Sequence, residues 1–258
     1  MNPTSDTWAE VFAYMPQFLS GLRITVEVSV IAFICSLFLG IVGAAARRSK
    51  HLAARLAATV YVEAFRNTPL LLQVFIAYFG LPAIGLPISA FQAGTGALAV
   101  NAGAYLTEII RGGIEAVPQG QYDATHVLAL SRLDAFTHVV LPQAIRNVYP
   151  PIINQFIQIL LGSSLLSAIA LPELTGVSET VNSITLRTMQ VFAVALVLYL
   201  VVSNAISLLA SLVGRYAFRP PLETRADSGS FRRWTQAVTA RIPSRGKLAE
   251  AGEGGGDS

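Results

Sequence analysis

Charged side chains are scarce in this sequence, because Asp, Glu, Lys and Arg together make up only 13% of its 258 residues. A soluble globular domain usually carries about 25%. Apolar residues account for 53%, and the mean hydropathy is +0.56. The composition therefore excludes an ordinary soluble domain and predicts a membrane protein. The net charge of +3 is small and the bases do not form one stripe, which argues against nucleic-acid binding.

Cysteine is almost absent. Cys35 is the single cysteine and lies in an apolar run, so the chain has neither an intrachain disulfide nor a thiolate-built metal site. The three histidines, His51, His126 and His138, do not form the i, i+4 pair of a helical zinc site. We expect them to be solvated or interfacial side chains, and we expect no bound metal.

Motifs for nucleotide hydrolysis and acyl transfer are also lacking. The pair Gly246-Lys247 is followed by Leu248 and has no glycine five residues before it, so it is not a phosphate-binding P-loop. No Gly-x-Ser-x-Gly nucleophile elbow occurs. The sequence therefore predicts a protein that is not an enzyme and has no ATPase motif of its own.

Long apolar runs are what the sequence has instead. A helix needs about 20 mostly apolar residues to cross a hydrocarbon core of about 30 Å. Five segments meet this demand: 24–46, about 58–81, about 89–110, about 150–170 and about 190–213. The first could be a cleavable signal peptide, but its leader is acidic and its core exceeds twenty residues, which favours a true span. We therefore predict an all-α integral membrane protein with five transmembrane helices.

The distribution of bases predicts the orientation of these spans, because basic links stay on the cytoplasmic side. Lys and Arg gather after the first span, in the link 111–149 and at the start of the tail. The N-terminus, the uncharged link LPAIGLP and the acidic link 171–189 alternate with them. We expect the N-terminus outside and the C-terminus inside, with a periplasmic segment 1–20, a transmembrane domain 21–216 and a disordered cytoplasmic tail 217–258.

The cytoplasmic link 111–149 is unusually long. Its pattern predicts one short helix over Gln121–Ser131 and a second over Leu133–Val140, ended by Leu141-Pro142. Helices that merely lie in the membrane interface usually carry mainly basic polar faces. Here acidic, basic and histidine side chains mix, which favours a protein partner.

This link contains DATHVLALSR at 123–132 and LPQA at 141–144. The two stretches resemble the "EAA" loop of ABC-transporter permease subunits, which has Glu-Ala-Ala, a glycine four residues later and Leu-Pro further on. Flanking motifs are similar to those of the polar amino-acid uptake branch: EAFRNTPLLLQ at 63–73, AYLTEIIRGGI at 104–114, NQFI at 154–157 and SSLLS at 163–167. The resemblance covers about residues 20–216.

The resemblance implies the transmembrane domain of a type I ABC importer in the bacterial inner membrane. Its implied partners are an ATPase subunit dimer that holds ATP and Mg, a second permease subunit, identical or homologous, and a periplasmic solute-binding protein. It implies no cofactor in this chain and no nucleic acid. A permease for another small solute, such as methionine or an opine, is the nearest alternative. A secondary transporter would usually have internal repeats, which the two halves do not show.

The "EAA" loop of the family forms a coupling helix that docks on the ATPase. The residues expected in that contact are Asp123, Ala124, Thr125, Leu128, Ala129, Ser131 and Arg132. Asp123, Thr125 and Ala129 stand where the family usually has Glu, Ala and Gly. The loop loses a flexible residue at Ala129, but we expect its fold to survive.

Polar residues within the spans are the candidates for a substrate pathway: Glu108, Asn101, Asn154, Gln158, Gly162, Ser163 and Ser164. Glu108 could equally be an interfacial charge paired with Arg111 at i+3. Glu63 and Arg66 have the same spacing, and we expect a structural pair. Where the branch usually has Lys-Asp-Thr-Ser, this chain has Leu161-Gly162-Ser163-Ser164, so a charged pair is replaced by apolar and small residues.

Overall fold

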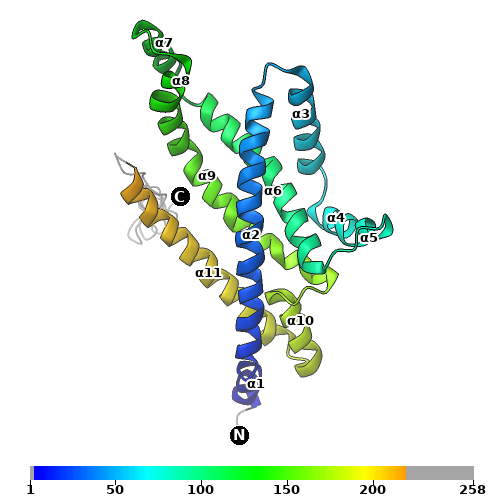
Figure 1. Ribbon diagram of the computed structural model, residues 1–258. Helices are drawn as coiled ribbons and strands as arrows, with labels where there is room; N and C mark the ends of the chain where they lie inside the picture. The colour runs from blue at the N-terminus through cyan, green and yellow to red at the C-terminus, as the bar shows by residue number, and fades with distance from the viewer. Residues whose placement is uncertain (1–2, 219–258) are drawn as a thin grey trace, which may run out of the picture. The chain divides into compact units, whose positions relative to one another are not determined.

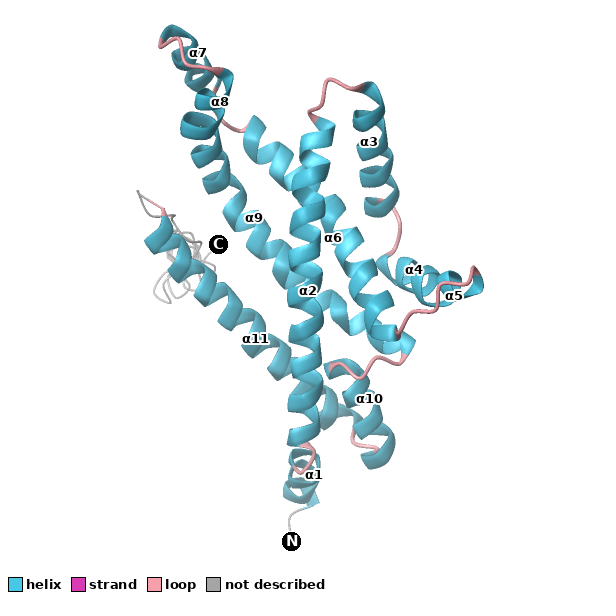
Figure 2. Cartoon of the chain, in the orientation of Figure 1, coloured by secondary structure: helices cyan, strands magenta, loops and turns pink. Residues whose placement is uncertain are grey.

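A computed structural model describes residues 3–218 of the chain, and every regular element in that range is helical (Figures 1 and 2). The chain forms two compact units, 1–210 and 211–258; the packing described below belongs to the first. The elements are α1 (Pro3–Phe12), α2 (Met15–Arg47), α3 (Leu52–Arg66), α4 (Leu70–Phe75), the π-helix η1 (Ile76–Gly80), α5 (Leu81–Ala83), α6 (Ala90–Glu115), α7 (Gln119–Val127), α8 (Arg132–Asp134), the π-helix η2 (Ala135–Val140), α9 (Leu141–Gly162), the 3-10 helix η3 (Ser163–Ile169), α10 (Leu174–Thr185) and α11 (Thr188–Ala217). Most of the tail expected at 217–258 lies outside the described residues.

Three helical stretches in the described range are long and apolar enough to cross a membrane: Met15–Arg47, Arg132–Ile169 and Thr188–Ala217. They contain the first, fourth and fifth expected spans. The third expected span falls on α6, which is not among these three stretches and has Ser89 as its N-cap. The Ser89 hydroxyl accepts a hydrogen bond from the Gln92 N–H (3.2 Å), and the Gln92 side chain accepts one from the Ser89 N–H (3.0 Å). This reciprocal cap satisfies two of the amides that a helix start leaves unpaired.

Small residues bring α2 and α6 close together. A side chain added at Gly40 would collide with Leu106, and one added at Gly43 would collide with Thr107. Gly113 of α6 faces Val148 of α9 with equally little space. Membrane helices gain most of their association energy from such close packing, because lipid is as apolar as their side chains. The α2–α6 pair therefore forms the centre against which α3 and α9 pack.

The expected single helix over 58–81 is wrong. α3 ends at Arg66, residues 67–69 leave the helical conformation, and α4 begins at Leu70 in a different direction (Figure 2). The cause is Pro69, which lacks a backbone N–H and drives the residue before it out of the helical region. The second expected span is therefore two helical segments joined by a break.

The expected helix end at Leu141-Pro142 is also wrong. One helical run continues from Arg132 to Ile169, and Pro142 lies inside it. The six residues before Leu141 form the π-helix η2, and the π-helix η1 precedes Leu81-Pro82 in the same way. A proline inside a helix clashes with the carbonyl four residues earlier. The wider π turn relieves that clash, so both helices run through a Leu-Pro pair.

The links gather at two ends of the first unit. Figure 1 shows α7, α8 and the α2–α3 turn at one end, and α1 and α10 at the other. Glu173 links the helices at the end formed by α1 and α10. Its buried carboxylate accepts hydrogen bonds from the Gly176 N–H (2.8 Å), the Tyr199 hydroxyl (2.8 Å) and the Thr25 hydroxyl (3.2 Å). It thereby ties the start of α10 to both α2 and α11.

Candidate functional site

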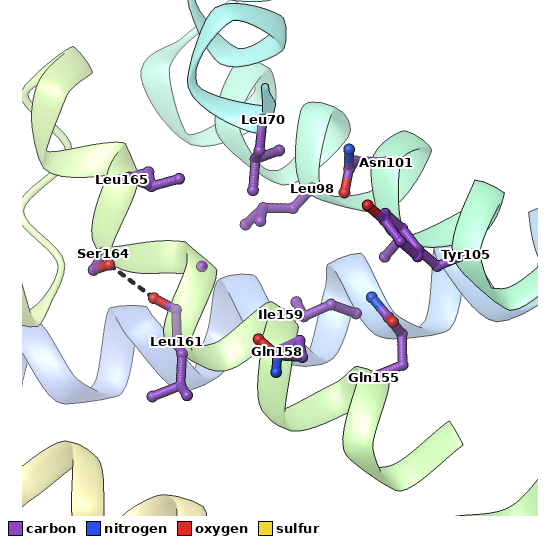
Figure 3. Close-up of a pocket in the computed structure, with 12 residues that line it drawn as sticks. Leu70, Leu98, Asn101, Tyr105, Gln155, Gln158, Ile159, Leu161, Ser164 and Leu165 are labelled. Carbon is purple, nitrogen blue, oxygen red and sulfur yellow. Dashed lines mark hydrogen bonds between the residues drawn. The ribbon is translucent and has the colours of Figure 1, made fainter. Parts of the chain in front are cut away.

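A cavity of about 600 Å³ lies between α4, α6, α9 and η3 (Figure 3). Its walls combine leucine side chains with amides and hydroxyls. The lining residues are Leu70, Leu98, Asn101, Ala102, Tyr105, Gln155, Gln158, Ile159, Leu161, Gly162, Ser164 and Leu165. None of these, all within the described part of the chain, is charged.

Four of the predicted pathway residues line this cavity: Asn101, Gln158, Gly162 and Ser164. Three others do not line it. Ser163 is buried and donates to the Leu160 carbonyl, Asn154 is exposed on another side of α9, and Glu108 lies further along α6.

Asn101 has a fixed orientation. Its amide nitrogen donates to the Phe65 carbonyl (3.0 Å) and to the Gln73 side-chain oxygen (3.0 Å). A carbonyl can only accept, so the atom facing Phe65 must be the nitrogen. The Asn101 side-chain oxygen therefore forms none of these bonds, and Asn101 lines the cavity together with Tyr105 (Figure 3). The site presents a fixed hydrogen-bond acceptor.

The opposite wall supplies adaptable groups. The side-chain amides of Gln155 and Gln158 form no hydrogen bond with another described residue. The Ser164 hydroxyl donates to the Leu161 carbonyl at 2.7 Å, so its oxygen remains free to accept. A ligand in this cavity would thus meet both donors and acceptors but no fixed charge.

The absence of charge on the cavity wall depends on Leu161 and Gly162. Both lie on the cavity wall, at the positions where the sequence lacks the Lys-Asp pair typical of the amino-acid branch. A side chain added at Gly162 would meet Leu70 and Leu98 at ordinary contact distance, 3.5 Å. The wall therefore accepts a Cβ at position 162 without a collision.

The sequence prediction missed Tyr105 and Gln155. Helical spacing could have found them, since Tyr105 is four residues after Asn101, and positions 155, 158, 159 and 162 share one helix face. Asn154 is one residue, about 100°, away from that face.

Glu108 belongs to a charged cluster at the ends of α2 and α6. Its carboxylate lies 2.8 Å from Arg111 and 3.3 Å from Arg47, and Arg111 also contacts Glu115 at 2.6 Å. Arg47 additionally donates to the Thr59 hydroxyl of α3 at 2.9 Å. The cluster ties three helices together at this end of the unit.

The expected Glu63–Arg66 pair does not form in the described structure. The Glu63 carboxylate instead accepts a hydrogen bond from the Asn67 amide (2.8 Å). The Arg66 guanidinium lies over the Tyr105 ring, 5.3 Å from its centroid. The i, i+3 spacing placed the two charges near each other, but the helix ends directly after Arg66 and supplies other partners.

The loop between α6 and α9 projects an exposed surface. Asp123, Ala124, Leu128, Ala129, Ser131 and Arg132 of the expected coupling set are exposed. Thr125 is buried, and its hydroxyl donates to the Tyr122 carbonyl, so it supports the loop from within. Ala129 has a φ of +50°, the left-handed conformation that glycine adopts without strain. The apolar side chains of Val127, Leu130 and Leu133 are also exposed in this loop.

Within residues 3–218 no group of three or more His, Cys, Asp and Glu side chains could hold a metal ion. The fold and the cavity together define a helical membrane protein with a neutral polar cavity between its helices and an exposed loop at one end.

Comparison with known proteins gives the family. Residues 36–216 match the family described as "Binding-protein-dependent transport system inner membrane component", and the chain belongs to it. It is 37% identical over 198 residues to the probable glutamine ABC transporter permease protein GlnM of Bacillus subtilis, covering 77% of this chain and 92% of that protein. It is 32% identical over 204 residues to the L-cystine transport system permease protein TcyB of the same organism, covering 79% and 87%.

Solved structures agree. A chain of an amino acid ABC transporter crystallised with histidines has a TM-score of 0.78 and 36% identity, covering 81% of this chain and 98% of that one. A chain of the methionine ABC transporter MetNI in an inward-facing conformation has a TM-score of 0.62 and 16% identity, covering 78% of this chain and 98% of that one. At this identity the likeness shows a shared fold alone. The chain has the permease fold of type I ABC importers.

Proposed function

We propose that this chain forms the translocation pathway of an ABC importer for an amino acid with a neutral, polar side chain. The observation that carries this proposal is the cavity between α6 and α9, whose walls offer three amides and two hydroxyls and no charge. Two relatives are named as a probable glutamine permease and an L-cystine permease, and both amino acids are neutral overall and rich in hydrogen-bonding groups.

The proposed topology has five spans, with the N-terminus outside and the C-terminus inside. It is supported by the placement of the basic α2–α3 turn and the 111–149 link at one end of the unit, opposite α1 and α10 (Figure 1). In this topology the broken pair α3 and α4–α5 makes up the second span. Interrupted helices occur in membranes where neighbouring side chains satisfy the freed backbone groups.

The proposed partners are an ATPase dimer, which binds ATP and Mg, a second permease subunit and a periplasmic binding protein. The exposed surface of Asp123, Ala124, Leu128, Ala129, Ser131 and Arg132 is the docking site proposed for the ATPase. The helical run from Arg132 to Ile169 connects that surface directly to the cavity wall. A movement of the ATPase can thereby reach Gln158 and Ser164 as a rigid-body displacement.

Reconstituted uptake tests the proposal. The chain, its second permease subunit, its ATPase and its binding protein in proteoliposomes are expected to accumulate L-glutamine in an ATP-dependent manner, and to take up L-arginine and L-glutamate much less. In Gly162→Asp, a carboxylate on the cavity wall should favour L-arginine over L-glutamine by about tenfold or more relative to the parent.

Gly162→Asn is the matched control, because it adds nearly the same volume without the charge and should not change the ranking. Absence of ATP-dependent uptake of every amino acid tested would refute the proposed function. If Gly162→Asp and Gly162→Asn changed the ranking of the amino acids equally, the role assigned to the uncharged wall would be refuted.

A further inference from the structure

α3 ends at Arg66, next to residues that line the cavity. The last carbonyls of any helix lack partners within it, and in a membrane each must be satisfied by another group. The Glu63 carbonyl accepts from the Asn67 N–H (3.2 Å), and the Ala64 carbonyl accepts from the Thr68 hydroxyl (2.8 Å). These two caps are local to the break.

The final two carbonyls are capped from other helices. The Phe65 carbonyl accepts from the Gln73 amide of α4 and the Asn101 amide of α6, both at 3.0 Å. The Arg66 carbonyl accepts from the Tyr105 hydroxyl at 3.4 Å. Asn101 and Tyr105 are one helical turn apart on α6, and both line the cavity. The end of α3 is thus held by the side chains that a ligand would touch.

The Tyr105 contact is the weak member of this set. Hydroxyl donors usually lie 2.7–2.8 Å from their acceptor, roughly 0.6 Å closer than in this bond. The Arg66 guanidinium over the ring holds the side chain by a cation–π contact. A ligand carboxylate is a stronger acceptor than a backbone carbonyl, and it can draw the hydroxyl away at little cost.

We propose that Tyr105 couples occupancy of the cavity to the break between α3 and α4. When a ligand binds, the Tyr105 hydroxyl leaves the Arg66 carbonyl for the ligand, and the end of α3 loses a cap. The segment 67–69 then becomes free to change the angle between α3 and α4. This inference rests on the proposed function, because it assigns the ligand to the same cavity.

Distance measurements across the break test the proposal. Cys35 is replaced by serine, and spin labels are attached at Val60→Cys on α3 and Phe79→Cys on η1, two exposed positions. The assembled transporter is measured by pulsed electron resonance with and without L-glutamine. We expect L-glutamine to shift the distance distribution, and Tyr105→Phe to abolish the shift and raise the KM for uptake by about three- to tenfold.

Tyr61→Phe is the matched control. The Tyr61 hydroxyl of α3 donates to the Val100 carbonyl of α6 at 2.6 Å, so it joins the same two helices, but Tyr61 does not line the cavity. This variant should keep the ligand-induced shift. Arg66→Gln removes the guanidinium and keeps the carbonyl, and it should populate the shifted distance without ligand.

The possible failures are distinguishable. If the parent takes up L-glutamine and the distance does not respond, or if Tyr105→Phe responds like the parent, the coupling role is refuted while the proposed function stands. If Tyr105→Phe does not assemble, an unaltered distance distribution in Arg66→Gln refutes the coupling role. If the parent transports no amino acid, both inferences fail.

Discussion

Ala129 adopts a backbone conformation that its side chain makes costly. At φ +50° a residue with a Cβ pays about 1–2 kcal/mol relative to the right-handed region. The position lies two residues after the end of α7, and the Ala129 N–H donates to the His126 carbonyl at 3.0 Å. The strained turn is therefore what brings α7 to its end and directs the chain towards α8.

Substitutions at Ala129 should consequently act on coupling. In Ala129→Val the β-branched side chain makes the left-handed turn still less favourable. We expect about tenfold less substrate taken up per ATP hydrolysed, measured in proteoliposomes. Ala129→Gly relieves the strain and should equal or exceed the parent, so a valine variant that matches the glycine variant would contradict the assignment.

Part of the cavity lining could be predicted from the sequence. Asn101, Gln158, Gly162 and Ser164 stand out because polar or small side chains are unusual in apolar spans. Tyr105 and Gln155 were missed because an aromatic ring and a motif glutamine both have ordinary packing roles. The pairing of Glu108 with Arg47 could not be predicted, since it depends on how α2 crosses α6.

Among the elements, the two π-helices have a common origin. Each directly precedes a Leu-Pro pair inside a continuing helix. The sequence prediction ran a span through Pro69 and ended a helix at Leu141-Pro142, and it was wrong at both places. The difference is local: the residues around Pro69 cap the broken end through Thr68 and Gln73, whereas η2 absorbs Pro142 by widening. The length of an apolar run predicts neither the helix break at Pro69 nor the continuous helix through Pro142.

Pro142 should therefore set the direction of the coupling loop. In Pro142→Ala an N–H becomes available for the His138 carbonyl, and the π turn can revert to α-helix. A π turn holds one residue more than an α turn. Its conversion to an α turn therefore rotates the coupling loop by about 100° relative to α9. We expect a several-fold loss of uptake per ATP hydrolysed. Pro150→Ala, inside α9 without a π turn, should stay within about twofold of the parent, and a similar loss there would contradict this explanation.

For the whole molecule, the proposed number and orientation of the spans rest on charge and length rather than on tertiary contacts. Labelling with a membrane-impermeant maleimide tests them. In a Cys35→Ser background, Leu86→Cys and Ser183→Cys should react from the periplasm. Ser49→Cys and Ser131→Cys should react only after the inner membrane is opened. The reverse pattern would invert the proposed topology.

The uncharged walls of the cavity also bear on the electrical work of transport. Moving one elementary charge through 100 mV costs or gains about 2.3 kcal/mol. With no ionised side chain on the wall and a cargo whose ammonium and carboxylate cancel, neither a passing molecule nor a wall that shifts around it moves net charge through the field. The passage of the amino acid along this wall would then be indifferent to voltage.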